Sequence, residues 1–291
     1  MTAPTPVSEP DATYRETPVA ERPLVRQVAE RRVWPVFLFR ALAMQGMHPT
    51  IMAGIEDHST FFDDPMGRRA RTLSYAYRMF FGESQQDTAQ EIRELHRDIK
   101  GTGYNGRPYH AWNREAWTWV HLTAVEAMIY ALSVSFWPLH PGDVEAFYQQ
   151  GRQTGLLYGV RDQDMPTDLA GLHDYISAGI DNKLVRSPGS DRLQKFVNDQ
   201  SLLAAASLPR QLRAVLEPVV RQPAFTLAFG AFPQRVRDLW GIKWTRRRQG
   251  EYVWLLATIR ALSTPLPDRQ RMVPDAYRAL CGQVCPAPPM R

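Results

Sequence analysis

Residues 116–137 read AWTWVHLTAVEAMIYALSVSFW and form the most apolar stretch of the chain. The stretch contains no Lys or Arg, but it does contain His121 and Glu126. A bilayer-spanning helix rarely carries such groups, because ionisable side chains are costly in hydrocarbon. We therefore interpret it as the buried central helix of a soluble domain, capped by Asn113, and expect no transmembrane span.

On both sides of this stretch, apolar residues recur at a period of about 3.6, and the alternation typical of strands is scarce. The chain shows no internal repeat and no linker between two cores. The pattern predicts an all-α fold, a single globular multi-helix domain of about ten helices within residues 31–280. Helices are expected at 33–46, 48–58, 65–81, 84–100, 116–137, 141–158, 166–180, 209–220, 233–240, 250–263 and 274–280. Asp63-Asp64 is expected to cap the helix that begins at Pro65, and Ser84 is expected to cap the next one. Residues 101–108 are expected to form a loop or a short hairpin.

The two ends of the chain differ from this pattern. Residues 1–30 contain five prolines and no apolar central region, so they are not a secretory signal and are expected to be disordered or loosely attached. Residues 281–291 are expected to be a C-terminal tail. The two cysteines, Cys281 and Cys285, are too few for a disulfide framework and, without a flanking His, weak as a zinc site. A reducing, cytoplasmic location fits this cysteine usage.

Composition narrows the function classes. With 44% hydrophobic residues, eight Trp and 22% charged residues, the chain is not a disordered protein. The formal net charge is +5, and the densest basic run is Arg246–Arg248. This run is short, follows Trp244 and lies in no nucleic-acid-binding motif, so we interpret it as a solvated helix start and expect no nucleic-acid partner.

Common catalytic signatures are missing: there is no Gly-rich phosphate loop, no Gly-x-Ser-x-Gly and no His-Glu-x-x-His. Among seven histidines, His96 stands out, because it continues the apolar positions Ala89 and Ile92 at helical spacing. A buried imidazole needs a hydrogen bond or a metal. From this residue alone, a core histidine bonded to a backbone carbonyl is the favoured reading, and a cofactor ligand is the alternative.

Two further elements could carry chemistry. Arg68, Arg71 and Thr72 share one polar face of their helix, which is either solvated or the wall of a pocket for an anion or an oxygen ligand. His121 and Glu126 lie five residues apart, a poor spacing for two ligands on one helical face. His121 is therefore expected to face a cavity or to hold a ligand residue in position through a hydrogen bond.

Several segments, taken in order, resemble the bacterial oxygenase family named after MpaB, whose catalytic domain is shared with the rubber-cleaving latex clearing protein. The resemblance covers residues 33–266, and it depends on the ordered set, since no single segment is specific. The segments are His48-Pro49, Arg68-x-x-Arg71-Thr72, Leu95-His96, Gly101, Gly106-Arg107-Pro108-Tyr109, Trp119-Val120-His121, Met165-Pro166-Thr167 with Tyr175, and Pro233 through Trp240-Gly241-Ile242.

The resemblance implies an all-α, globin-like fold that holds haem b through one axial histidine. By position, His96 would be the proximal iron ligand, with His121 as the less favoured choice. Arg68, Arg71 and Thr72 would line the oxygen side. The chain has Arg71 where the rubber oxygenases have Lys, and a guanidinium is a poor iron ligand, so Arg71 is not expected to bind iron directly.

The function implied is that of a haem-dependent oxygenase, an oxidoreductase that uses dioxygen on a hydrophobic, unsaturated substrate of lipid or isoprenoid type. The apolar lining could come from Phe37, Phe39, Met128, Ile129 and Tyr130, although core packing explains these residues equally well. Two alternatives stay open. One is a haem or small-molecule binding protein without turnover, such as a sensor. The other is a metal-free helical scaffold.

Overall fold

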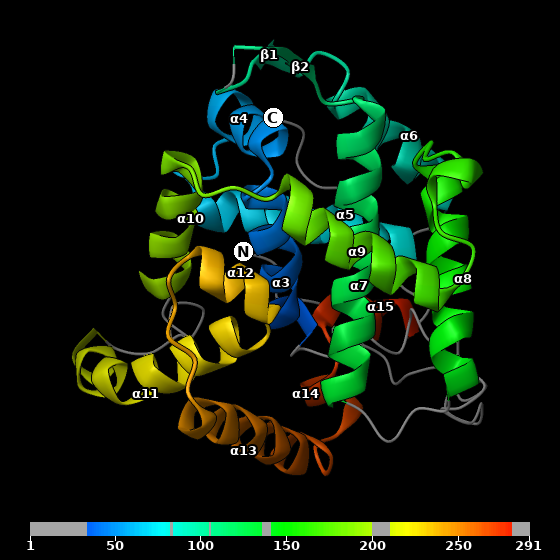
Figure 1. Ribbon diagram of the computed structural model, residues 1–291. Helices are drawn as coiled ribbons and strands as arrows, with labels where there is room; N and C mark the ends of the chain where they lie inside the picture. The colour runs from blue at the N-terminus through cyan, green and yellow to red at the C-terminus, as the bar shows by residue number, and fades with distance from the viewer. Residues whose placement is uncertain (1–33, 82–83, 105, 136–140, 200–209, 281–291) are drawn as a thin grey trace, which may run out of the picture.

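The apolar stretch around His121 forms α7 (Arg114–Ser135), which runs through the centre of the computed structural model (Figure 1). Asn113 caps this helix, because its Oδ1 accepts hydrogen bonds from the backbone N–H groups of Glu115 and Ala116, both at 3.1 Å. Trp119, Leu122 and Leu132 along the helix are fully buried. Among residues 34–81, 84–104, 106–135, 141–199 and 210–280, which the structure describes, no helix is long and apolar enough to cross a membrane.

Helix α3 (Trp34–Gly46) packs antiparallel against α7. Near its C-terminus, the Gln45 side chain donates to the carbonyl of Val120 at 3.1 Å, and the indole of Trp119 donates to the carbonyl of Met44 at 3.3 Å. At its middle, Arg40 pairs with Glu126. The polar groups of these two apolar helices thus bind one another in the core, as buried polar groups must.

Three helices and a hairpin follow α3: α4 (Pro49–His58), α5 (Pro65–Phe81), α6 (Gln85–Leu95), then β1 (Lys100–Thr102) and β2 (Pro108–His110). Both predicted caps form, since Asp64 accepts from Gly67 N–H at 2.9 Å and Ser84 accepts from Asp87 N–H at 3.1 Å. The antiparallel β1–β2 pair confirms the hairpin. The helix predicted at 84–100 corresponds to α6, and its predicted end was wrong, because the helix stops at Leu95 and Lys100 pairs with His110 in the hairpin.

The remaining elements are α8 (Pro141–Leu157), the 3-10 turn η2 (Asp162–Asp164), α9 (Leu169–Lys183), α10 (Pro188–Asp199), α11 (Arg210–Gly230), α12 (Gln234–Leu239), α13 (Arg246–Ser263), α14 (Asp268–Arg271) and α15 (Pro274–Leu280). Helix α11 continues through Pro218 and Pro223 to Gly230, although the prolines suggested an end at residue 220. A helix tolerates an internal proline at a local cost when packing on both sides holds it.

The described residues therefore form thirteen α-helices in a single all-α domain, somewhat more than the ten expected. The fold class is confirmed, and a globin-like arrangement stays a prediction. The two predicted tails, the second of which contains Cys281 and Cys285, lie outside the described residues. Residues 31–33 lie outside them as well.

Candidate functional site

Helices α5 and α6 pack side by side and build the part of the molecule that contains most of the predicted site residues. The two helices run in opposite directions, since Arg78 near the end of α5 pairs with Glu91 of α6, and the first turns of α5 lie near the last turn of α6. Arg68, Arg71 and Thr72 come from the start of α5, and His96 is the C-cap of α6. Residues that are more than 20 positions apart in the sequence are thus brought together by the packing of two adjacent helices.

His96 is partly buried, with its ring edge-on to Trp117 at 5.2 Å between ring centroids. Its Nδ1 lies 2.7 Å from the carbonyl oxygen of Ile92, one helical turn earlier. A carbonyl oxygen only accepts, so the ring proton is on Nδ1 and Nε2 carries a lone pair. Within the described residues, no hydrogen-bond partner meets this Nε2. Burial lowers the pKa of His96, the Ile92 carbonyl offsets part of this, and the charge of Arg68 lowers it further.

Arg68 lies close enough to His96 to influence its protonation. Its Nε donates to the Ser59 hydroxyl at 3.3 Å, and its NH1 donates to the Thr72 hydroxyl at 2.5 Å. Among the described residues, no carboxylate lies at ion-pair distance from Arg68. Burial and the neighbouring Arg71 lower the pKa of Arg68. A guanidinium in this state is an electropositive group whose charge is not neutralised.

Arg71 is oriented differently from Arg68. Its NH2 donates to the Thr60 hydroxyl at 2.7 Å, and its NH1 lies 3.5 Å from the carboxylate of Asp64. Arg71 therefore ties the start of α5 to the segment that precedes it. Of the three predicted polar residues on α5, the structure joins Arg68 and Thr72 directly and gives Arg71 other partners.

His121 lies on the α8 side of α7. It is buried, and its Nε2 lies 2.9 Å from the carbonyl oxygen of Gly151. Burial lowers the pKa of His121 to about 4. A Cβ at Gly155 would come within 2.7 Å of this Nε2, so the ring is tightly enclosed. Trp117 and Tyr158 lie between the two histidines, since the Trp117 indole donates to the Tyr158 carbonyl at 3.0 Å and the Tyr158 ring contacts His121.

The expected apolar lining does not lie near His96. Ile129 belongs to the main core, and Phe39, Met128 and Tyr130 pack against that core. Tyr130 lies 13 residues beyond Trp117 on α7, about 20 Å along the helix. The side chain of Phe37 lies outside the described residues. Core packing, the alternative explanation for these residues, accounts for those that the structure describes.

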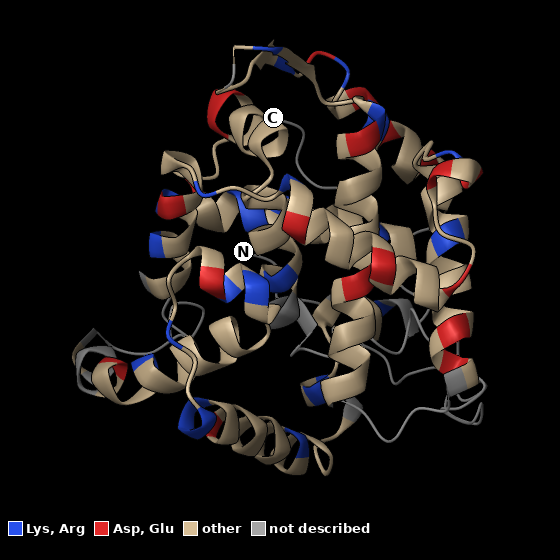
Figure 2. Cartoon of the chain, in the orientation of Figure 1, with Lys and Arg blue, Asp and Glu red and all other residues tan. Residues whose placement is uncertain are grey.

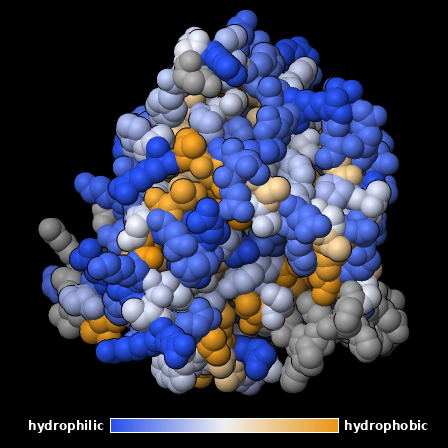
Figure 3. Space-filling model, viewed as in Figure 1, coloured by the Kyte–Doolittle hydropathy of each residue, from blue (hydrophilic) through white to orange (hydrophobic). Residues whose placement is uncertain are grey.

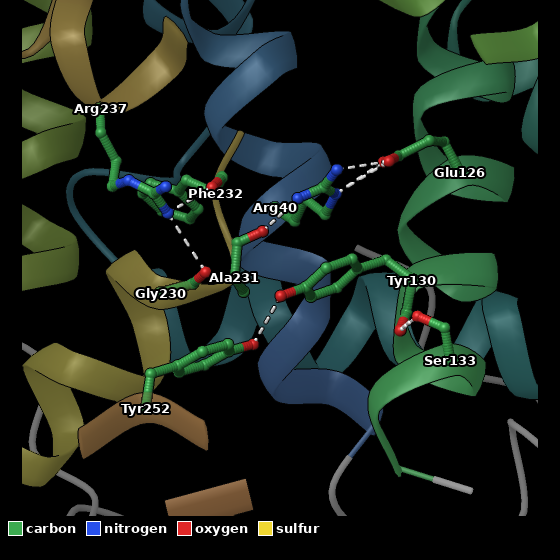
Figure 4. Close-up of polar contacts among 9 residues, drawn as sticks. All are labelled: Arg40, Glu126, Tyr130, Ser133, Gly230, Ala231, Phe232, Arg237 and Tyr252. Atoms are coloured by element: carbon green, nitrogen blue, oxygen red, sulfur yellow. Dashed lines mark hydrogen bonds and ion pairs between the residues drawn. The ribbon is translucent and has the colours of Figure 1, made fainter. Parts of the chain in front are cut away.

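Arg40 is the centre of a buried polar network that was not among the predicted sites (Figure 4). Arg40 binds Glu126 on α7 and the carbonyl of Ala231, and its guanidinium lies 4.2 Å from the centre of the Tyr130 ring. The Tyr130 and Tyr252 hydroxyls lie 2.9 Å apart. This network connects α3, α7, the end of α11 and α13. A lone arginine within the apolar residues 33–46 was the signal in the sequence.

Arg237 forms a second part of this network and was also missed. Its NH1 donates to the carbonyls of Phe229, Gly230 and Phe232, at 3.2, 3.2 and 2.6 Å. Phe229 and Gly230 are the last residues of α11, whose carbonyls have no partner within the helix, and Phe232 lies in the segment that follows it. Arg237 therefore caps α11, and its role is structural.

A separate polar group surrounds His48. This residue is 6% exposed, and its buried Nδ1 has no hydrogen-bond partner among the described residues. Its Nε2 lies 4.0 Å from Glu115, which is also paired with Lys183 at 3.0 Å. Burial lowers the pKa of His48, Glu115 raises it and Lys183 lowers it. Within the part of the chain that the structure describes, no group of three or more His, Cys, Asp or Glu residues is arranged to hold a metal ion.

Three comparisons relate the chain to known proteins. A family model described as "ER-bound oxygenase mpaB/B'/Rubber oxygenase, catalytic domain" matches residues 25–261. Two curated relatives are the uncharacterised proteins Mb2261 of Mycobacterium bovis and Rv2237 of Mycobacterium tuberculosis. Each is 22% identical over 233 residues, which cover 78% of this chain and 86% of the relative. No solved structure matches the chain.

Proposed function

The chain belongs to the family of mpaB and rubber oxygenase catalytic domains, and from this premise we propose that it is a haem-b-dependent oxygenase. In this proposal the enzyme uses dioxygen to oxidise a hydrophobic, unsaturated substrate of lipid or isoprenoid type. His96 would hold the haem iron, and Arg68 and Thr72 would act on the oxygen side. Membership of an oxygenase family supports the reaction class, and the geometry around His96 supports the assignment of residues.

The free Nε2 of His96 is the observation that carries the proposal. Metal-bound histidines almost always donate their other ring N–H to a carbonyl or carboxylate, which orients the ring and makes the free nitrogen more basic. In His96 this donor is Nδ1 and the acceptor is the Ile92 carbonyl. Because its pKa is lowered, the ring is neutral at pH 7 and its lone pair is available to a metal.

The donor set around His96 fits haem. Haem b would supply an iron at which dioxygen can be activated, and the protein would need to provide one ligand to it. His96 would be that ligand. His121 fits less well, because its Nε2 is already bonded to the Gly151 carbonyl in a closed environment.

Arg68 would stabilise negative charge that develops on the oxidant. Its positive charge has no carboxylate at ion-pair distance among the described residues, and a preorganised donor in a partly buried site is far more effective than in water. The Thr72 hydroxyl holds the guanidinium in place and accepts one of its hydrogen bonds. Arg71, which is held by Thr60 and Asp64, would keep the start of α5 in position.

Absorption spectra of the protein supplied with haem test this proposal. We expect a Soret band that shifts on reduction under carbon monoxide. His96→Ala is expected to lose this band while its far-ultraviolet circular dichroism stays helical. His121→Ala is expected to keep the band, and His173→Ala, at an exposed position, is the matched control.

Two results would contradict the assignment. A featureless spectrum of the wild-type protein after haem reconstitution would exclude haem binding, and a normal Soret band in a folded His96→Ala variant would exclude His96 as the ligand. The oxygenase part is tested separately, by oxygen uptake with unsaturated lipids and isoprenoids. A haem protein that consumes no oxygen with any of them would instead be the binding or sensor protein.

A further inference from the structure

The outer face of α13 differs from the usual surface of a globular protein. The inner face is anchored by Tyr252, which is 2% exposed and lies against Gly230 of α11, where a Cβ would come within 2.3 Å of the tyrosine ring. On a helix packed in this way, the opposite face is normally polar.

The outer face of α13 is instead apolar along its centre. Val253 is 56% exposed and Trp254 is 65% exposed. Successive residues of a helix are rotated by about 100° around its axis. Ala257 and Ala261 therefore lie between Val253 and Trp254 when the helix is viewed along its axis. A shallow surface pocket of about 390 Å³ lies on this face, lined by Ala257, Arg260, Ala261, Thr264 and Pro265. We call Val253, Trp254, Ala257 and Ala261 the α13 face. Hydrophobic residues reach the surface at the bottom of Figure 3, where α13 lies.

Positive charge is concentrated around the α13 face. Residues 243–271 contain seven basic residues and two acidic ones, Glu251 and Asp268. This excess of five basic residues equals the formal net charge of the whole chain, +5. The rest of the chain therefore contains equal numbers of basic and acidic residues. Helical geometry places Arg247 and Arg260 on the two edges of the face and Arg246 within its arc, at the N-terminal end of the helix. The Arg247 side chain is 89% exposed. Figure 2 shows the basic residues at the start of α13.

We propose that the α13 face binds an anionic lipid bilayer. A helix that lies in a membrane surface combines an apolar strip, often with Trp, and Arg or Lys at its edges. Here Val253 and Trp254 would enter the headgroup region, and the three arginines would bind lipid phosphates. Nucleic acid would use the arginines but leave the apolar centre exposed to water. A second copy of the chain would bring two basic faces together, which repel.

The proposal is independent of the chemistry at His96, because it concerns only a surface of the folded chain. For the proposed enzyme, binding at this face would bring the protein to a bilayer, where apolar substrates are concentrated. No helix among the described residues is able to span a membrane, so attachment at this face would be reversible.

Co-sedimentation with lipid vesicles tests the proposal on the full chain. Vesicles of phosphatidylcholine are compared with vesicles that contain phosphatidylglycerol in addition. We expect binding to the anionic vesicles, which weakens as salt is raised. Val253→Ser with Trp254→Ser is expected to weaken it at least tenfold, because apolar burial is lost. Arg246→Gln with Arg247→Gln and Arg260→Gln is expected to weaken it about 100-fold at low salt, from about fivefold per arginine.

Matched controls are Val185→Ser, Arg69→Gln and Lys195→Gln, which alter exposed residues on other elements. These variants are expected to bind like the wild-type protein. Three outcomes would overturn the proposal: no binding to anionic vesicles by the folded wild-type protein, unchanged binding by the Val253 and Trp254 variant, or a dimer in solution that the same variant dissociates. The last result would assign the face to a second copy of the chain.

Discussion

At the scale of single residues, His96 and His121 differ in which ring nitrogen binds a backbone carbonyl, and this difference separates a candidate ligand from a structural group. Both rings bind a backbone carbonyl. His96 uses Nδ1 and a carbonyl of its own helix, whereas His121 uses Nε2 and a carbonyl of the neighbouring helix. The first arrangement leaves the outer ring nitrogen available, and the second occupies it.

His121 gives a prediction on pH dependence. Its pKa is about 4 in the folded protein, against about 6.5 in an unfolded chain. The unfolded state therefore binds the extra proton first, and the free energy of unfolding falls as the pH drops from about 6.5 to about 4. The full loss is on the order of 3 kcal/mol. In His121→Gln, whose amide can still donate to the Gly151 carbonyl, this part of the pH dependence should vanish.

Urea denaturation at several pH values between 7 and 4 measures this effect. Other groups also titrate in this range, so the test is the difference between variants. His173→Gln, at an exposed site, should keep the wild-type slope. Identical slopes for the wild-type protein and His121→Gln would show that His121 is not the group responsible.

Arg68 gives a second prediction at this scale, which depends on the proposed haem site. A hydrogen bond to a charged partner contributes about 1.5–3 kcal/mol. Arg68→Gln should therefore keep its haem spectrum but bind azide at least about tenfold more weakly in the ferric state. Arg69→Gln, at the exposed neighbouring position, should bind azide like the wild-type protein. Equal affinities for all three proteins would remove Arg68 from the oxygen side.

At the scale of helices, close crossings depend on glycine. At the contact of α9 with α7, a Cβ on Gly179 would come within 2.0 Å of the Trp119 ring, which is fully buried. Gly179→Ala should therefore destabilise the fold by about 1–3 kcal/mol. Gly250, on the outer side of α13, has nothing within 4 Å of such a Cβ. Gly250→Ala should stabilise by up to about 1 kcal/mol, because alanine is the better helix former.

Thermal unfolding of the two glycine variants measures both effects, since the same substitution is made in a helix each time. The prediction requires opposite signs. A melting temperature that rises for Gly179→Ala would mean that Trp119 can move and that the crossing is looser than the structure indicates.

At the scale of the whole molecule, the network in Figure 4 joins segments from both halves of the chain. The Arg40 and Glu126 side chains are only 12% and 10% exposed. Removing one member of a buried ion pair leaves an uncompensated charge, at a cost of about 3–5 kcal/mol. Glu126→Gln should therefore destabilise the protein strongly. Glu251→Gln, which breaks the exposed pair with Arg247, should change stability by less than about 1 kcal/mol.

Chemical denaturation of the two glutamine variants compares a buried ion pair with an exposed one. Similar losses in both would mean that the Arg40–Glu126 pair is accessible to water. A strong loss in Glu126→Gln alone would establish that α3 and α7 are held together by this pair as well as by their apolar contacts.

Local signals in the sequence predicted much of the fold. The apolar period predicted the helices, and Asp64, Ser84 and Asn113 form the predicted caps, because capping depends on residues only three or four positions apart. Prediction failed where distant segments decide the outcome. The helix at Ser84 stops early because its continuation pairs with β2, and α11 continues past its prolines. Helix α10 was not expected at all.

The same division holds for the site. The sequence by itself determined the all-α class and the family resemblance, and it drew attention to His96, Arg68, Arg71 and Thr72. Only the tertiary structure decided which of these residues meet, which nitrogen of each histidine is free, and that Arg40 finds Glu126. Periodicity and caps arise from contacts within a few residues. Hydrogen-bond partners across the core depend on helix packing, which brings together residues that are far apart in sequence.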